Sequence, residues 1–234
     1  MKRLLLLVAV AVTAAVEAQE VAIASPSTTR IPQFSVSGTS PIQALLKLAQ
    51  SENVPLGIVE DDQQLCSSEI NYFGKDVAPS AVVAGILSNV HGYTWRIVPG
   101  SNVLVIAPSE MRPVTTRLLG LTDSDFVPVK NNLQGLEAML WVHVLHILYP
   151  NASSGGSILS SSNDRIYYLE AKDQTVEGIL NELAEKTKGA WVLRPLPATL
   201  DNLTGDLPFS IFSIDGQGDK AAVVCLPVRE ENQP

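Results

Sequence analysis

Apolar and polar residues follow strand and helix periods in turn from residue 34 onward. Phe34 and Val36 alternate with serines, which is the period of a strand. Ser40 then precedes Pro41, the order of a helix N-cap followed by proline at the first helical position. In the segment that follows, apolar side chains recur at i, i+3, i+4 and i+7: Ile42, Leu45, Leu46 and Ala49. The pattern predicts a strand and then a helix with one buried face.

The same succession of elements continues to residue 108. The expected elements are strands at 56–59 and 70–73, a turn at 74–76, a helix that opens at Pro79-Ser80, and hairpin strands at 93–97 and 103–106 joined by Pro99-Gly100. Alternation leads us to expect Trp95 and Trp191 to be buried against helices and Tyr93 to face outward. Residues 34–108 are therefore predicted to form one α+β unit.

The second half of the chain repeats the motif order of the first half, with slightly different spacings. The first copy is Lys75-Asp76, Gly85-Ile86-Leu87, Gly92, Trp95 and Pro99, and the second is Lys172-Asp173, Gly178-Ile179-Leu180, Gly189, Trp191 and Pro195. We therefore expect a second α+β unit over 114–228, which follows a linker at 108–113.

The second unit has its own pattern of strands and helices. The expected elements are strands at 126–129, 165–169, 190–193, 209–214 and 221–226, a helix at 133–148, and a helix with the apolar stripe Val176, Ile179, Leu180, Leu183 and Ala184. Residues 150–163, rich in serine and glycine, are predicted to form a mobile loop, and 229–234 a disordered tail. The predicted fold class is α+β, with two small β-α-β-β-α-β units that each pack two helices on a small mixed sheet.

Residues 1–18 have the composition of a secretory signal peptide. Lys2 and Arg3 precede an apolar run from Leu4 to Val16, and the small Ala18 closes the segment. The run is shorter than the roughly 20 apolar residues that span a bilayer. We expect cleavage after Ala18, an extended leader at 19–33, and a periplasmic or secreted protein without stable membrane insertion; an uncleaved anchor is the alternative.

Charge and cysteine content restrict the partners and the covalent structure. The formal net charge of -8 argues against binding to a nucleic-acid phosphate backbone. The two cysteines, Cys66 and Cys225, are either a disulfide that closes a long loop in an oxidising compartment or two buried free thiols. The spacing of these residues does not decide between the two states.

The first unit also carries a family resemblance. The segments concerned are Phe34-Ser35-Val36, Ala44 to Ala49, Val54 to Ile58, Gly92-Tyr93-Thr94-Trp95 and Val103 to Ile106. In these segments the unit resembles the short N-terminal domain shared by secretins and TonB-dependent outer-membrane receptors of Gram-negative bacteria, although Asn53 stands where that family usually has glycine. The resemblance implies a periplasmic module that docks onto other proteins, for example in a secretion, pilus or transport assembly.

The residue types that catalysis or metal binding requires occur without the necessary spacing. His143 and His146 lie three apart on an apolar helix, which favours partly buried helix residues over zinc ligands. Glu60-Asp61-Asp62 is interpreted as a solvated turn after a strand rather than as paired catalytic carboxylates. Four aromatic residues could form a binding surface or belong to the core: Tyr72, Phe73, Tyr93 and Trp95. The sequence therefore predicts no catalytic, cofactor or metal site.

These observations favour an exported, non-catalytic protein-interaction (adaptor) module of the bacterial cell envelope whose partner is an envelope protein. One alternative is an envelope hydrolase with dispersed catalytic groups, which would have to use His91, His143 or His146. The other alternative is a periplasmic protein that binds a small ligand in a pocket between the two units.

Overall fold

The computed structural model of the chain describes residues 30–61, 63–122, 128–148, 165–170, 172–195 and 209–214. Its strands are β1 (Ile31–Thr39), β2 (Leu56–Val59), β3 (Ile70–Val77), β4 (Tyr93–Ile97), β5 (Leu104–Pro108), β6 (Val129–Asn131), β7 (Tyr167–Leu169), β8 (Ala190–Pro195) and β9 (Phe209–Ile214). Its helices are α1 (Pro41–Glu52), α2 (Gln64–Ser67), α3 (Pro79–Leu87), α4 (Pro113–Leu119), α5 (Leu133–Leu148) and α6 (Val176–Thr187). Mixed sheets and helices confirm the predicted α+β class.

A single five-stranded sheet takes strands from both halves of the chain. The strand order is β4-β5-β2-β8-β9, with β2 parallel to both β5 and β8. This differs from the expected pair of units with separate sheets. The reason lies in β2, whose four residues are all buried: a strand that is apolar on both faces belongs in the middle of a sheet, with layers on either side.

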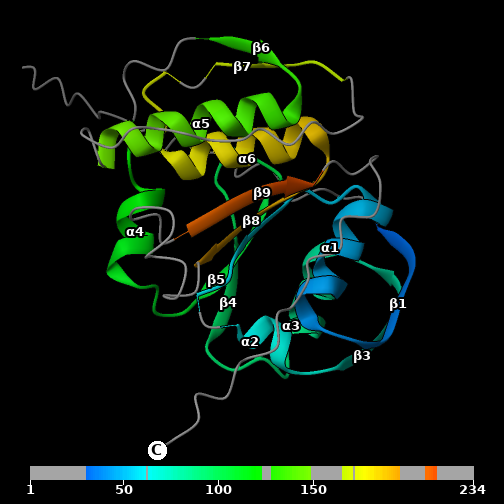
Figure 1. The fold of residues 1–234 in the computed structure, drawn as a ribbon. Coiled ribbons are helices and arrows are strands. Elements are labelled where there is room, and N and C mark those ends of the chain that lie inside the picture. The colour runs from blue at the N-terminus through cyan, green and yellow to red at the C-terminus, as the bar shows by residue number, and fades with distance from the viewer. Residues whose placement is uncertain are drawn as a thin grey trace, which may run out of the picture.

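The helices of the two halves cover opposite faces of this sheet (Figure 1). Helices α1 and α3 pack on one face, with the antiparallel pair β1-β3 outside them. Helices α5 and α6 pack on the other face, with β6-β7 outside them. Each apolar core is shared, because Val192 of β8 lies in the core under α1 and α3 while Val59 of β2 lies in the core under α5 and α6.

Local signals set the helix boundaries that the sequence predicted. The hydroxyl of Ser40 caps α1 by accepting from the backbone N–H of Gln43, and Pro41 opens the helix. The hydroxyl of Thr175 caps α6 by accepting from the N–H of Gly178 at 3.1 Å. Helix α6 ends at Thr187 and is capped by Lys188, which has a positive φ of 50° and whose backbone N–H bonds the last-turn carbonyls.

Two strands are longer than predicted because they pair with each other. Strand β1 begins at Ile31, inside the expected leader, and β3 runs through the expected turn at 74–76. Gly74 lies opposite Phe34 and Lys75 lies opposite Gln33, so the pairing continues where the local sequence indicated a turn. Two short helices, α2 and α4, were not predicted, and α4 begins at Pro113, the end of the expected linker.

The prediction for the aromatic residues of β4 was half wrong. Trp191 is fully buried, as expected, whereas Trp95 is only half-buried where it packs against the core under α1 and α3. Tyr93 packs against the same core rather than facing outward. Residues two positions apart in a strand share a face, so Tyr93 must follow Trp95.

Several predictions lie outside the described residues. These are the signal peptide 1–18, most of the leader 19–33, the loop 150–163, the strand 221–226 and the tail 229–234. Across the described ranges, no helix is both long and apolar enough to cross a bilayer.

Candidate functional site

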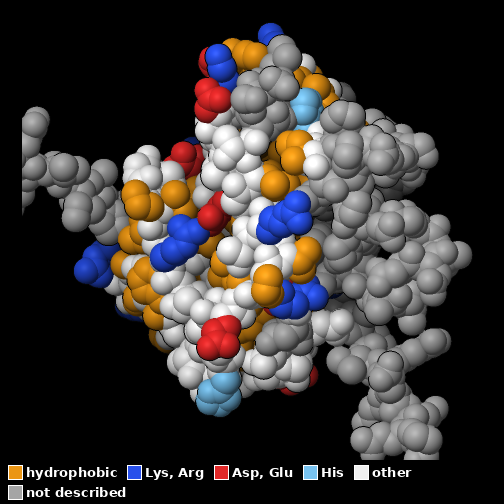
Figure 2. Space-filling view, turned by 90° about the vertical axis from the view of Figure 1, so that its left-hand side faces the viewer, with side chains coloured by type: hydrophobic (Ala, Val, Ile, Leu, Met, Phe, Trp, Pro, Cys, Tyr) orange, Lys and Arg blue, Asp and Glu red, His pale blue; other side chains and the backbone are white. Residues whose placement is uncertain are grey.

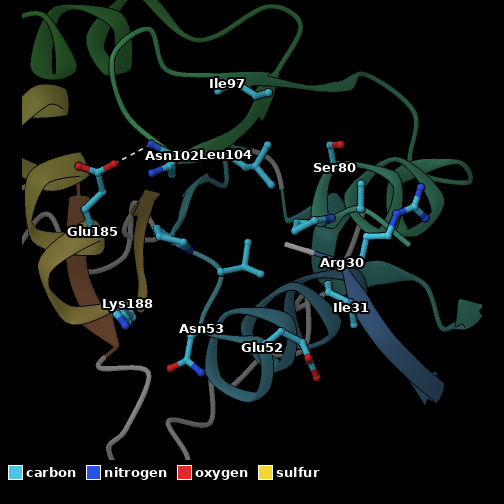
Figure 3. Close-up of a pocket in the computed structure, with 14 residues that line it drawn as sticks. Arg30, Ile31, Glu52, Asn53, Ser80, Ile97, Asn102, Leu104, Glu185 and Lys188 are labelled. Carbon is cyan, nitrogen blue, oxygen red and sulfur yellow. Dashed lines mark hydrogen bonds between the residues drawn. The ribbon is translucent and has the colours of Figure 1, made fainter. Parts of the chain in front are cut away.

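An open cavity of about 820 Å³ lies where the two halves of the chain meet (Figure 3). The first half lines it with the start of β1, the end of α1, the start of α3 and the β4-β5 turn, while the second half contributes the end of α6. Its residues are Arg30, Ile31, Glu52, Asn53, Val54, Pro55, Ala78, Pro79, Ser80, Ile97, Asn102, Leu104, Glu185 and Lys188. A volume of this size is within the range of protein ligand sites, about 300–1,000 Å³.

The apolar part of the cavity wall belongs to the folded core. Ile31, Val54 and Leu104 are 3 %, 6 % and 4 % exposed, so each is held by neighbours on its other sides. Ile97 closes one side at the end of β4. These buried side chains are fixed by packing and form a rigid part of the cavity wall.

Charged residues of both signs stand around the cavity. The carboxylate of Glu185 accepts from the backbone N–H of Asn102 at 2.6 Å, which ties α6 to the β4-β5 turn across the junction of the halves. The hydroxyl of Ser51 lies 2.8 Å from the Lys47 carbonyl oxygen and 3.1 Å from the Glu52 carboxylate, and its single proton can serve only one of them well. Arg30 makes an exposed ion pair with Asp76 at 3.4 Å and also donates to the Asp76 backbone carbonyl. Glu185 therefore already holds a hydrogen-bond donor.

A second polar cluster lies at the opposite end of the strands, where β2 and β8 finish. Glu60 follows β2 and is fully buried, and its carboxylate pairs with the guanidinium of Arg194 on β8. Arg194 also donates to the sulfur of Cys66 at 3.3 Å. A carboxylate in this position is stable only because the guanidinium compensates its lost hydration. The cluster joins the two halves and leaves little charge available for chemistry.

Asp61 holds helix α4 to the same end of the sheet. Its side chain is 6 % exposed and accepts from the Thr115 hydroxyl at 2.8 Å and from the backbone N–H of Arg112 at 3.0 Å. The Arg112 guanidinium pairs with it at 3.1 Å. The interpretation of Glu60-Asp61-Asp62 as a solvated turn is therefore wrong for Glu60 and Asp61, while Asp62 is outside the described residues.

The sequence left open whether the two cysteines form a disulfide or remain free thiols, and the structure describes only Cys66 of the two. Cys66 is disulfide-bonded, and the chain has one other cysteine, Cys225, which lies outside the described residues. The pairing of Cys66 with Cys225 stays a prediction.

The structure places two of the three histidine side chains. His91 is exposed after α3, His143 is half-buried on α5, and the side chain of His146 is outside the described set. In the described part of the chain, no three histidine, cysteine or acidic residues are grouped to hold a metal ion.

The four aromatic candidates do not form one surface. Phe73 is 67 % exposed on β3, while Tyr72 turns inward beside Phe34 with a ring separation of 6.3 Å. Burial raises the pKa of the Tyr72 hydroxyl above its ordinary value. Tyr93 and Trp95 lie on β4 at the edge of the large sheet. On the face drawn in Figure 2, acidic and basic side chains are intermixed with apolar ones between them.

No protein-family model, curated protein or solved structure matches the chain. The resemblance to the short N-terminal domain of secretins and TonB-dependent receptors therefore stands on the sequence segments alone.

Proposed function

We propose that the protein is a non-catalytic protein-interaction module of the bacterial cell envelope that binds a partner by adding a strand of it to β4. The family resemblance and the signal-like N-terminus support the location and the adaptor role. The observation that carries the proposal is the position of β4, which ends the strand order of the large sheet.

The outer edge of β4 presents regularly spaced backbone groups. Strands β4 and β5 pair so that Thr94 lies opposite Ala107 and Arg96 lies opposite Val105. Backbone hydrogen bonds between the two chain segments at Gly92 and at Val98 flank these two pairs. Alternate residues of an antiparallel pair direct their N–H and C=O groups to the partner strand and away from it. The backbone groups of Tyr93, Trp95 and Ile97 therefore point to the edge, where those of Trp95 and Ile97 can bond an extended peptide.

The side chains of the same three residues favour such an addition. Tyr93, Trp95 and Ile97 pack half-buried against the core under α1 and α3 because no described strand covers their outer side. A new strand would bury their remaining apolar surface, which stabilises the complex by about 25 cal/mol per Å². Recognition through backbone groups does not require particular side chains, so it is compatible with the few reactive side-chain groupings among the described residues.

The test compares two substitutions at Trp95 in the producing bacterium. Trp95→Ala removes the ring but keeps the outward N–H, whereas Trp95→Pro removes both and spares the bonds of Thr94 and Arg96 to β5. Proline is tolerated in edge strands. A photo-reactive residue at Thr94 should cross-link one envelope protein, and Trp95→Pro should abolish the product while Trp95→Ala only weakens it.

Thermal unfolding of both variants checks that the fold is retained. Equal cross-linking in the Trp95→Pro and Trp95→Ala proteins would show that the backbone edge is not the binding element, and the proposal would then be wrong.

A further inference from the structure

We infer that the cavity between the two halves binds a segment of the partner chain that carries a large apolar side chain next to an acidic one. The inference rests on the proposed function, because it assumes that the ligand is a polypeptide. The cavity begins at Ile97, the last residue of β4, so a chain that pairs with β4 can continue into it (Figure 3).

The apolar side chain is required by the composition of the walls. Half of the lining residues are apolar, and they come from several elements: Ile31, Val54, Pro55, Ala78, Pro79, Ile97 and Leu104. Ile31, Val54 and Leu104 have almost no exposed area left, so the surface open to a ligand comes mainly from Pro55, Ala78, Pro79 and Ile97. Water in contact with these four residues is released when a side chain replaces it, which favours binding in proportion to the apolar area covered. A purely polar or purely charged ligand would leave these walls without a suitable partner.

The acidic side chain of the ligand is inferred from the charged residues of the cavity, some of which already have partners. Glu185 accepts from the backbone N–H of Asn102. The ammonium of Lys188 is exposed and makes no hydrogen bond or ion pair within the described part of the chain. Arg30 pairs with the Asp76 carboxylate and also donates to the Asp76 backbone carbonyl, but the two side chains are 62 % and 71 % exposed, and such a pair is weak. Lys188 is thus more available to a ligand than Glu185.

The backbone of Lys188 is held in place by hydrogen bonds. It has φ 50° at the end of α6, where its N–H bonds the carbonyls of Ala184 and Glu185. Its backbone is therefore held at the cavity rim, on the side opposite Arg30 and Ser80 (Figure 3). A ligand carboxylate in the cavity can approach Lys188 on one side or Arg30 on the other. Which of the two cations it meets depends on where the neighbouring apolar side chain of the ligand binds.

The experiment selects phage-displayed random heptapeptides on the full chain and measures the affinity of the enriched peptides by fluorescence polarisation. We expect enrichment of large apolar residues adjacent to aspartate or glutamate. Asn102→Trp and Ser80→Trp place an indole on two different sides of the cavity, and each should weaken binding by about tenfold or more. Asn102→Trp leaves the backbone bond to Glu185 in place.

Lys188→Asn tests the charge and keeps a residue that tolerates positive φ. It should weaken binding by about two- to fivefold, the range of an exposed ion pair. Lys130→Asn is the matched control, because Lys130 is an exposed lysine on β6, outside the cavity lining, and its removal should change nothing.

Enriched peptides without an acidic residue, or peptides that bind both tryptophan variants as tightly as the parent chain, would overturn the inference. The two proposals fail separately. If Trp95→Pro abolishes the envelope cross-link while Asn102→Trp leaves peptide binding intact, the edge proposal stands and the cavity inference is wrong. If Trp95→Pro leaves the cross-link unchanged while Asn102→Trp abolishes peptide binding, the cavity inference stands and the edge proposal is wrong.

Discussion

The contact between Gly57 and Trp191 is the most direct test of the shared sheet. Gly57 of β2 lies opposite Trp191 of β8, and the indole covers the space where a side chain of residue 57 would stand. A methyl group on Gly57 would lie 2.5 Å from Cε2 and 2.8 Å from Nε1 of Trp191. These separations are far shorter than the roughly 3.5–4.0 Å of favourable contact.

The indole cannot move aside easily. Trp191 is completely buried, and its Nε1 donates to the Oδ1 of Asn181 at 2.9 Å. Gly57→Ala should therefore lower the free energy of unfolding by about 1–3 kcal/mol, the usual cost of overpacking a core. If Trp191→Leu is added, the methyl group gains room, and the two changes should be non-additive by about 0.5–3 kcal/mol.

Urea unfolding followed by tryptophan fluorescence measures these free energies, with circular dichroism as the second probe for the variants that lack Trp191. Gly178→Ala is the matched control, because an added methyl group would meet the side chains of Gln174 and Thr175 at 3.3 Å, a much milder contact than at Gly57. Alanine is also a better helix former than glycine by about 1 kcal/mol, which acts against any loss, so the control should lower the free energy of unfolding much less than Gly57→Ala does. The shared cores also predict one cooperative transition.

A Gly57→Ala protein as stable as the parent, or additive effects of the two changes, would show that β2 and β8 do not meet as described. Two separate unfolding transitions would contradict the shared sheet as well.

Three further outcomes are expected. Arg194→Met should destabilise the fold by about 3–5 kcal/mol, since it leaves the buried Glu60 carboxylate without its partner, and adding Glu60→Gln should recover most of this loss in urea unfolding. Asp61→Asn should cost about 1–3 kcal/mol and increase amide exchange in α4, because it removes the charge that Arg112 binds; unchanged exchange would contradict this. The raised pKa of Tyr72 contributes stability that is present below its ordinary value of 10.0 and is lost as pH rises through the raised value. Tyr72→Phe should therefore reduce the loss of stability at alkaline pH. The same fall in stability with rising pH in the parent and the Tyr72→Phe protein would refute this.

Helix positions could be predicted because their signals are local. The cap at Ser40, the proline at Pro41 and the apolar stripe of α1 lie within a few residues of one another, and the same holds for α6 behind Thr175. The sequence could also predict that Trp191 is buried, since it begins an apolar strand directly after a helix.

Strand length and polar burial depended on partners far away in the chain. Strand β3 continues through 74–76 only because β1 pairs with it from the other side of α1. Glu60 is buried only because Arg194 arrives beside it at the end of β8, and no pattern around residue 60 announces that partner. Nothing local distinguishes these residues from an ordinary solvated turn.

The sequence by itself determined the helices, the apolar strands and the α+β class, because hydrogen bonds and side-chain contacts at spacings of two to four residues decide them. Only the tertiary structure decided that β2 and β8 join in one sheet and that the ends of α1, α3 and α6 leave a cavity between them. The physical reason is that sheet pairing and cavities arise from segments distant in the chain, and many pairings satisfy the same local pattern.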